Sequence, residues 1–305
     1  MTWNIKTGGR DGADGRRLER VFRVVAEAEP DVLALQELRG FGRPGLLSRG
    51  RPGPPGASAP GSPGAGAPGP FGAAGSPGAG APGWPGASGA GPLGRLAAAV
   101  GLRPYLARSL TGQPVAVLVR PGWPVLAAGP VRRPFHHAAQ RVTLGTSAGP
   151  LVVIGTHLQP FSGARRFREA GWLAAAVRGA PLALLAGDLN TLDPWTEHAD
   201  RLAALDPAYR RRHLRPDGAV DTRAVARLAD AGLVDLFRAV GTGDGWTAPT
   251  TGVAGPEFST MRLDYLLATP ELTRHARRCV VLRGGEIETA SDHYPLLAEF
   301  DLAAA

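Results

Sequence analysis

The stretch that decides the fold runs PLALLAGDLN from Pro181 to Asn190. Its apolar residues follow one another without polar alternation, which is typical of a strand buried on both faces. Asp188 and Asn190 then follow two residues apart, so their side chains point the same way at the carboxyl end of that strand, where α/β folds bind their ligands. Taken alone, the pattern is more typical of a turn or a helix cap.

Polar side chains of similar chemistry follow other strand-like runs. The run DVLALQE at 31–37 ends on a carboxylate, and LVVIGTH at 151–157 ends on an imidazole. TWNI at 2–5 offers an amide, and SDH at 291–293 precedes the terminal run at 294–302. One such ending indicates a turn, whereas five indicate a shared site.

Six segments of the chain resemble, in order, the motifs of the endonuclease/exonuclease/phosphatase superfamily of metal-dependent phosphoesterases. They are TWNI at 2–5, PDVLALQE at 30–37, GTHL at 155–158, AGDLN at 186–190, RLDYLL at 262–267 and SDHYPL at 291–296. Each is short enough to occur by chance, but six in family order frame nearly the whole chain. The resemblance implies an α/β fold, a four-layer sandwich of two mixed β-sheets flanked by helices.

Length and composition fit one large domain. The chain has 305 residues, and its 44% hydrophobic residues suffice for a sizeable core. From 42 to 91 the chain is rich in Pro, Gly, Ala and Ser, and GSPGAGAPG occurs at 61–69 and again at 75–83. Such a segment cannot bury enough apolar surface to offset its ordering entropy. We therefore expect one catalytic domain, residues 1–41 and 92–305, with a disordered insert at 42–91.

Periodicity and breakers predict the secondary structure of the rest. Helices are expected over 16–29, 93–100, 164–177, 194–205, 222–231 and 234–240. Short strands are expected near 103–109, 114–120, 125–128 and 140–146.

The formal net charge of +8 at first favours a phosphate-rich partner. However, Lys6 is the only lysine among the 34 basic residues, and Arg, Ala, Gly and Pro are all encoded by GC-rich codons. The charge is therefore weak support for nucleic acid. The expected partner is a phosphoester substrate, which can be a small molecule, a lipid head group or nucleic acid, and the chain is expected to be a monomer.

Cysteine usage and hydropathy exclude other classes. Cys279 is the only cysteine, which excludes an intrachain disulfide and a cysteine-based metal site, and it is expected in a buried strand. No apolar run approaches the ~20 residues needed to cross a bilayer. The chain opens directly on TWNI without a signal-peptide pattern, so we expect a cytoplasmic protein, an expectation that a start codon further upstream would change.

The resemblance implies magnesium-dependent hydrolysis of a phosphoester bond by in-line attack of an activated water. Mg²⁺ prefers hard oxygen ligands, and Mn²⁺ is an alternative. The expected ligands are Glu37, Asn4 and Asp292. Asp188 is expected to position and deprotonate the attacking water, and Asn190 to bind the scissile phosphate.

Two histidines complete the expected site. His293 would donate to a phosphate oxygen in the transition state, and the resemblance implies that Asp264 holds its other nitrogen. For Asp264, a salt bridge to Arg262 is the competing interpretation. The resemblance implies that His157 contacts the phosphate from the side opposite His293. The THL motif that contains His157 resembles the one in pancreatic-type deoxyribonucleases, sphingomyelinases, inositol-phosphate phosphatases and deadenylases. This motif argues against a dedicated abasic-site repair enzyme.

Other polar residues favour simpler interpretations. His136 and His137 are expected to be exposed loop residues, because neighbours on an extended chain face opposite ways. A solvated helix face is at least as good an interpretation as substrate contact for Arg165, Arg166 and Arg168. Lys6 lies where many relatives carry Asn or Asp, which predicts one essential magnesium. The alternative to an enzyme is a catalytically weak superfamily member that serves as a binding or scaffold module.

Overall fold

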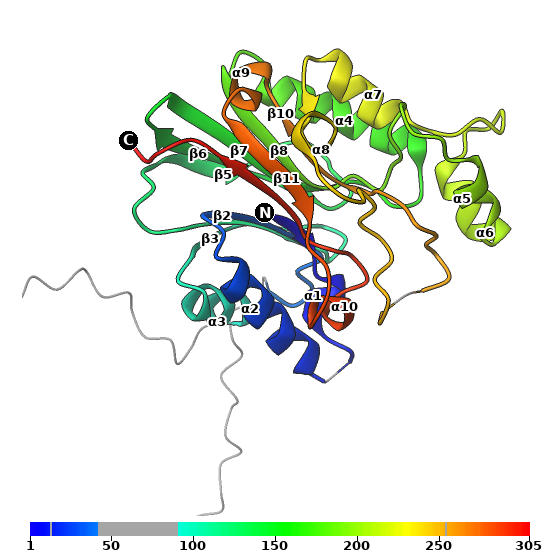
Figure 1. Ribbon diagram of the computed structural model, residues 1–305, viewed down its shortest axis with the longest axis horizontal. Helices are drawn as coiled ribbons and strands as arrows, with labels where there is room; N and C mark the ends of the chain where they lie inside the picture. Colours follow the sequence, from blue (N-terminus) through cyan, green and yellow to red (C-terminus); the bar gives the residue numbers. More distant parts are fainter. Residues whose placement is uncertain (13, 42–90, 254) are drawn as a thin grey trace, which may run out of the picture.

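The computed structural model describes residues 1–12, 14–41, 91–253 and 255–305. In this part of the chain the strands form two six-stranded sheets that pack face to face, with helices on both outer sides (Figure 1). The expected α/β sandwich of two mixed sheets flanked by helices is therefore confirmed. The expected insert at 42–91 lies outside the described residues, except for Gly91.

The first sheet joins the two ends of the chain. Its strand order is β11-β12-β1-β2-β4-β3, with bounds β11 Ala276–Val281, β12 Leu296–Phe300, β1 Thr2–Asn4, β2 Val32–Gln36, β4 Val115–Val119 and β3 Arg103–Ala107. β1 is parallel to β2, with Asn4 opposite Gln36, and antiparallel to β12. Asn4 therefore lies beside the end of β2 and near the loop that precedes β12.

The second sheet places three predicted site residues in one row. Its strand order is β5-β6-β7-β8-β10-β9, with bounds β5 Val125–Pro130, β6 Ala138–Thr146, β7 Gly149–His157, β8 Leu182–Asp188, β10 Asp264–Ala268 and β9 Val234–Asp235. β7 and β8 are parallel with His157 opposite Asp188, and β10 is antiparallel to β8 with Asp264 opposite Asp188. The register of three strands thus aligns these side chains at one end of the sheet.

Helices cover the outer faces of the sandwich (Figure 1). α2 (Arg16–Ala28) and α3 (Pro92–Ala99) lie on the first sheet, and α4 (Gly163–Val177) and α7 (Arg223–Asp230) lie on the second. The shorter helices are α1 Lys6–Gly9, α5 Ala199–Ala203, α6 Pro207–Arg210, the 3-10 helix η2 Arg211–His213, α8 Leu236–Val240, α9 Pro270–Thr273 and α10 Ile287–Ala290.

Apolar side chains from both sheets form the central layer of the core. Val117 from the first sheet packs with Val142 and Leu184 from the second. Gly155 on β7 allows the sheets to approach closely, because an added Cβ would lie 2.8 Å from Val117 Cγ2 and 3.3 Å from Ala34 Cβ. Burial of apolar surface stabilises such a core by about 25 cal/mol per Å². Two rigidly packed sheets therefore carry the strand ends where the polar residues lie.

Two helix predictions are wrong in detail. Only Ala199–Ala203 of the expected helix 194–205 is an α-helix. The expected helix 234–240 begins at Leu236, because Val234 pairs with Ala268 in the sheet and the Asp235 carboxylate caps the helix by accepting from the Phe237 amide at 3.0 Å. Cys279 lies buried in β11, as predicted.

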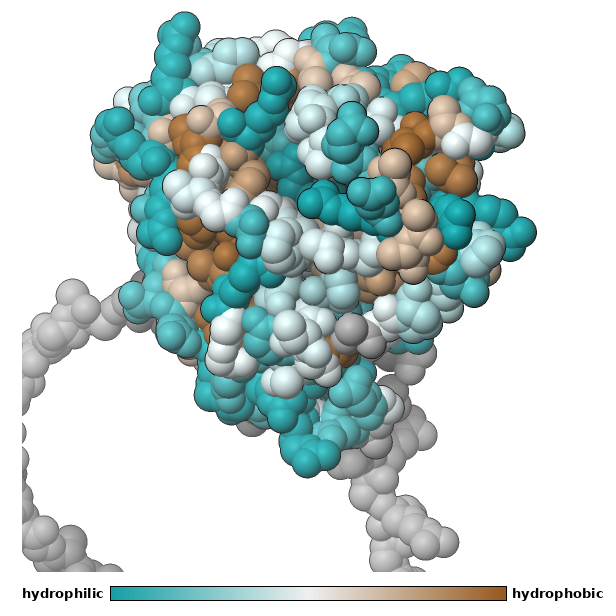
Figure 2. Space-filling view, turned by 45° about the vertical axis from the view of Figure 1, so that its right-hand side comes forward, coloured by the Kyte–Doolittle hydropathy of each residue, from teal (hydrophilic) through white to brown (hydrophobic). Residues whose placement is uncertain are grey.

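The described helices and the face in Figure 2 bear on contacts with membranes and partners. Within the described ranges no helix has the length and apolar character needed to cross a bilayer. On the face shown in Figure 2, apolar side chains lie in separate small groups among polar ones. This face therefore lacks the extended apolar patch that marks many protein interfaces.

Candidate active site

The predicted site residues converge at one end of the two sheets. Each lies at a strand end or in the loop before β12: Asn4 ends β1, Glu37 follows β2, His157 ends β7, Asp188 ends β8, Asn190 follows β8, Asp264 begins β10, and Asp292 and His293 precede β12. The sandwich brings the first and last of them together across 289 positions of sequence, since Ser291 Oγ donates to Asn4 O at 2.6 Å and Trp3 Nε1 donates to His293 O at 2.7 Å.

Asp188 is the centre of the cluster. Its Oδ2 accepts a hydrogen bond from Asn4 Nδ2 at 2.9 Å, and the same atom lies 3.3 Å from His157 Nε2 and 3.9 Å from His293 Nε2. Burial alone would raise the pKa of this carboxyl, but the charges of His293 and His157 outweigh burial and lower the pKa below its usual range. Asp188 is therefore ionised over the neutral range, surrounded by groups that hold the carboxylate in place.

His293 is held by a carboxylate on its far side. Its Nδ1 forms a 2.7 Å hydrogen bond with Asp264 Oδ2, and Phe258 packs edge-on against the ring. Burial alone would lower the pKa of His293, but Asp264 and Asp188 outweigh it and raise the pKa to about 10. Burial raises the pKa of Asp264. The pair thus retains a proton at neutral pH, and Nε2 of His293 faces Asp188 as a donor.

His157 is held by packing and by an amide. Asn190 Nδ2 lies 2.9 Å from His157 Nε2 and also donates to Leu158 O at 3.0 Å. The ring of His137 stacks on the ring of His157, with centroids 4.2 Å apart and planes 22° apart. Within the described residues, Nδ1 of His157 is buried without a hydrogen-bond partner. His157 therefore presents Nε2 to Asn190 and Asp188, while its Nδ1 is enclosed by the protein.

The hydroxyl of Thr111 sets the proton position of His137. Thr111 Oγ1 donates to His136 O at 2.9 Å, because a carbonyl can only accept. The same hydroxyl lies 2.9 Å from His137 Nδ1 and so accepts from it, which places the ring proton on Nδ1. Burial, and to a smaller extent the neighbouring His157, lower the pKa of His137 to about 2. His137 is thus a neutral ring packed against His157.

Glu37 lies beside Asp188 and is bound by three neighbours. Its Oε1 accepts from Asn4 Nδ2 at 3.2 Å, and its Oε2 accepts from the Thr7 amide at 2.8 Å and from Gln113 Nε2 at 3.2 Å. Asn4 Oδ1 in turn accepts from the Lys6 amide at 3.0 Å. The Asn4 side chain therefore holds the Glu37 and Asp188 carboxylates next to each other.

The backbone around these carboxylates is unusual. Lys6, Thr7, Glu37 and Asn190 have φ values of 46°, 50°, 59° and 50°, in the left-handed region. This conformation costs about 1–2 kcal/mol for each residue with a Cβ. Such positions concentrate at functional sites, where the surrounding structure enforces them.

Arg17 is the brace that enforces part of this backbone. It is 3% exposed, and its guanidinium donates to the carbonyl oxygens of Ile5 at 2.9 Å, Lys6 at 2.7 Å, Arg10 at 3.0 Å and Ala290 at 3.1 Å. One buried cation thus fixes the loop after β1 and links it to the loop that carries Asp292.

Asp292 is paired differently from the other carboxylates. Its Oδ2 lies 3.0 Å from Lys6 Nζ, and its Oδ1 is 3.3 Å from Ser291 Oγ. The Lys6 ammonium therefore neutralises one of the expected metal ligands.

The donor chemistry of the site fits a hard divalent cation. Glu37 and Asp188 offer carboxylate oxygens beside the Asn4 amide, and Asp292 offers another beside Lys6. Carboxylate and amide oxygens are the ligand type that Mg²⁺ takes. The structure also brings ligand atoms of Asp188, Asp264 and His293 within 4.8 Å of one another. Since Asp264 and His293 already bind each other at 2.7 Å, that trio fits an imidazole held by a carboxylate better than a metal-ligand set.

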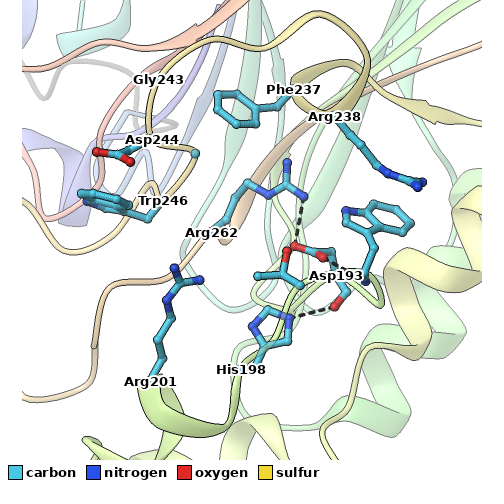
Figure 3. A pocket seen from close by; sticks show the side chains of 12 residues that line it. Asp193, His198, Arg201, Phe237, Arg238, Gly243, Asp244, Trp246 and Arg262 are labelled. Atoms are coloured by element: carbon cyan, nitrogen blue, oxygen red, sulfur yellow. Dashed lines mark hydrogen bonds and ion pairs between the residues drawn. The ribbon is translucent and has the colours of Figure 1, made fainter.

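A pocket of about 320 Å³ is lined in part by Arg262, Asp193 and Trp246 (Figure 3). The guanidinium of Arg262 points to Asp193 at 3.0 Å and also pairs with Asp235 at 2.7 Å. Arg262 therefore does not pair with Asp264, and the competing salt-bridge interpretation of Asp264 is wrong. Two carboxylates neutralise this central cation of the pocket.

Some residues at the site escaped the sequence interpretation. His137 was expected to be exposed, but it is 7% exposed and stacks on His157. Arg166 was expected on a solvated face or at the substrate, but it is fully buried and donates to the Gln159 and Pro160 carbonyls at 3.2 Å. Spacing along one strand or helix carries no signal for these contacts, because their partners come from other elements.

Comparisons with known proteins agree with this architecture. Residues 1–293 match the model of the Endonuclease/Exonuclease/phosphatase family, so the chain belongs to this family. The resemblance inferred from the six motifs is thereby confirmed. No curated protein matches the chain.

Solved structures share the fold at low sequence identity. An endonuclease/exonuclease/phosphatase from Bacteroides vulgatus has a TM-score of 0.63 at 14% identity, covering 100% of this chain and 97% of its own. A mannosyl-6-phosphatase of Bacteroides thetaiotaomicron has a TM-score of 0.59 at 14% identity, covering 99% and 98%. A Neisseria 3′ phosphatase bound to a product DNA hairpin has a TM-score of 0.59 at 19% identity, covering 98% of both chains.

Proposed function

We propose that the chain hydrolyses a phosphoester bond with the help of a divalent cation, Mg²⁺ or Mn²⁺, by in-line attack of an activated water. The observation that carries the proposal is the position of Asp188 Oδ2, 2.9 Å from Asn4 Nδ2, 3.3 Å from His157 Nε2 and 3.9 Å from His293 Nε2. An ionised carboxylate between an amide and two imidazoles provides the groups that a water and a phosphate need.

Glu37, Asn4 and Asp292 would hold the cation. When bound, it supplies charge neutralisation at the non-bridging phosphate oxygens. The amide of Asn4 keeps Glu37 close to Asp188, so the cation-binding and water-binding carboxylates lie side by side.

The remaining residues act on the water and the phosphate. Asp188 accepts the proton of the attacking water, and Asn190 donates a hydrogen bond to the scissile phosphate. His293 donates from Nε2 to a phosphate oxygen as charge develops there, while Asp264 fixes the ring through Nδ1. His157 contacts the phosphate from the side opposite His293, and its buried Nδ1 has no hydrogen-bond partner among the described residues.

The experiment is hydrolysis of bis(p-nitrophenyl) phosphate and p-nitrophenyl phosphate by protein purified with EDTA. Adding Mg²⁺ or Mn²⁺ restores turnover if the proposal is correct, and Asp188→Asn protein with an unchanged circular dichroism spectrum serves as the inactive control. Equal hydrolysis rates for the wild type and this variant in Mg²⁺ would contradict the proposal.

A specific contact favours the second candidate, a catalytically weak binding or scaffold module. Lys6 Nζ lies 3.0 Å from Asp292 Oδ2 and competes with a cation for that carboxylate. Calorimetric titration with Mg²⁺ separates the two candidates. A dissociation constant in the millimolar range or weaker, together with no turnover of either ester, supports the module.

The surface charge supports a small or lipid phosphoester rather than a polynucleotide. Many exposed arginines are paired with carboxylates, as in Arg23 with Glu286 at 2.7 Å and Arg120 with Asp31 at 2.9 Å. Cleavage of plasmid DNA, single-stranded RNA, sphingomyelin and an inositol phosphate should be compared at low and moderate salt. Efficient nucleic-acid cleavage that falls steeply with salt would reverse this preference. A cytoplasmic monomer remains our expectation.

A further inference from the structure

A second cavity, of about 590 Å³, lies on the Glu37 side of the candidate site. It is lined by Arg39, Gly40, Arg108, Ser109, Thr111, Gly112 and Pro114. We name this the Arg39/Arg108 cavity. Two arginines are part of this lining, and among the described residues no Asp or Glu contributes to it. The lining therefore favours an anion.

The cavity is joined to the candidate site by short contacts. The Arg39 amide donates to Glu37 O at 2.7 Å, and Gln113, which lies between two lining residues, donates to Glu37 Oε2 at 3.2 Å. On the other wall, Thr111 Oγ1 binds His137 Nδ1 at 2.9 Å, and His137 stacks on His157. The cavity thus adjoins both a proposed metal ligand and a proposed phosphate contact.

The two cations of the cavity are free to bind a ligand. In residues 1–12, 14–41, 91–253 and 255–305, the side chains of Arg39 and Arg108 form no hydrogen bond or ion pair with another residue. The other described pockets differ. Arg262 in the pocket of Figure 3 is neutralised by Asp193 and Asp235, and the remaining three described pockets each include Asp or Glu in their lining.

We propose that the Arg39/Arg108 cavity binds a second phosphate group of the substrate, separate from the phosphate that is hydrolysed. This inference rests on the proposed phosphoesterase function. The natural substrate then carries at least two phosphates, and Arg39 and Arg108 determine specificity for the one that does not react. Guanidinium groups suit this task because they bind phosphate oxygens with paired N–H donors.

The test compares two substrates that differ by one phosphate. They are the 5′-(p-nitrophenyl phosphate) ester of thymidine and the same ester with a 3′-phosphate. Wild type in Mg²⁺ should prefer the 3′-phosphorylated ester by at least about tenfold in kcat/KM, mainly through KM. In Arg39→Gln/Arg108→Gln protein the ratio of the two kcat/KM values should fall to about one.

The experiment also needs a matched control variant and a binding measurement that does not depend on turnover. Arg178→Gln changes an exposed arginine at the end of α4, and it should retain the wild-type ratio. Binding of thymidine 3′,5′-bisphosphate is measured by calorimetry in EDTA, where the double variant should bind at least about tenfold more weakly. If wild type hydrolyses neither ester, the proposed function fails, and this binding result alone decides the inference.

Either of two results would overturn the inference. They are a wild type with no preference for the second phosphate, or a double variant that keeps the wild-type ratio and the wild-type affinity for the bisphosphate. A single-stranded hexanucleotide in the same assay identifies the source of the phosphate. Affinity close to that of the bisphosphate indicates a small substrate, whereas much tighter, steeply salt-dependent binding that the double substitution weakens indicates a polynucleotide backbone.

Discussion

The two histidines on either side of Asp188 are held in different ways. His293 has a carboxylate behind it, with Asp264 Oδ2 2.7 Å from Nδ1. His157 has a neutral ring against its face, with His137 at 4.2 Å between centroids, and its Nδ1 has no partner in the described structure. His293 is therefore bound to carboxylates on both sides of its ring, whereas His157 has Asn190 and Asp188 at Nε2 and a neutral ring against its face. The two residues are suited to different tasks, proton donation and phosphate contact.

The loop beside each of the two histidines is also held by a carboxylate. On the His157 side, buried Glu169 accepts from the amides of His136 at 2.6 Å and Gln159 at 2.9 Å. On the His293 side, Glu288 accepts from the hydroxyls of Tyr294 and Thr251, both at 2.6 Å. The two halves of the site are therefore supported separately, and substitutions should separate their contributions.

The largest effect is expected at the centre that both halves share. Asp188→Asn removes the proposed acceptor for the water proton, and His293→Ala removes the proposed donor to phosphate, so each should lower kcat/KM at least about a hundredfold. Glu37→Gln should do the same through cation binding. Steady-state kinetics with bis(p-nitrophenyl) phosphate gives the values, with melting temperature as the control for folding. Activity close to that of wild type in any variant would contradict the role of that residue.

A smaller effect tests the charge behind His293. Asp264→Asn keeps the size of the side chain but removes the carboxylate that orients the ring, so kcat should fall roughly 10–100-fold with little change in KM. A loss confined to KM would show that Asp264 acts on substrate binding instead.

The corresponding substitution on the His157 side should have a smaller effect on activity. His137→Leu removes the stacked ring, and because an aromatic pair is worth about 0.5–1.5 kcal/mol, kcat/KM should fall roughly 2–12-fold. The loss should lie in KM if His157 binds phosphate. A loss of kcat/KM as large as that caused by Asp264→Asn would show that the two histidines are not held in different ways that matter for activity.

Substitution of Lys6 should strengthen Mg²⁺ binding, whereas the other substitutions weaken activity. Lys6→Asn removes the ammonium beside Asp292, and Asn tolerates the left-handed backbone that Lys6 adopts. Because a charge pair at this separation contributes about 1 kcal/mol even in bulk water, Mg²⁺ should bind at least roughly fivefold more tightly in calorimetric titration. Unchanged or weaker affinity would show that Lys6 does not compete with the cation.

The smallest effect concerns stability and pH. Burial would raise the pKa of Glu288, but hydrogen bonds from Thr251 and Tyr294 outweigh it and lower the pKa to about 2. A lowered folded-state pKa stabilises the protein above the ordinary value of about 4.5, and this contribution is lost as the pH falls towards 2. Glu288→Gln should therefore lower the free energy of unfolding by about 1 kcal/mol at pH 7. Urea titrations at pH 7 and pH 3 check whether the difference narrows in acid.

The strand ends of the site could be predicted from the sequence because they follow buried apolar runs. Asp188, His157 and Glu37 each end or follow such a run. Strand register places His157 beside Asp188, and Glu37, in the other sheet, meets Asp188 through Asn4. His137 could not be predicted, because its burial depends on Thr111 and His157, which lie on other segments. The same holds for Arg17, whose carbonyl partners reach as far as Ala290. Periodicity describes one element, and such contacts are made between elements.

The order of synthesis has a consequence for β1. This strand lies between β2 and β12, and Asn4 O accepts from Ser291 while Trp3 donates to the carbonyl of His293. A nascent chain on the ribosome therefore carries β1 without one of its two neighbours until β12 has been translated and has left the ribosome. The residues that would act on phosphate can assemble only from that point, so nascent chains that lack β12 should have no esterase activity.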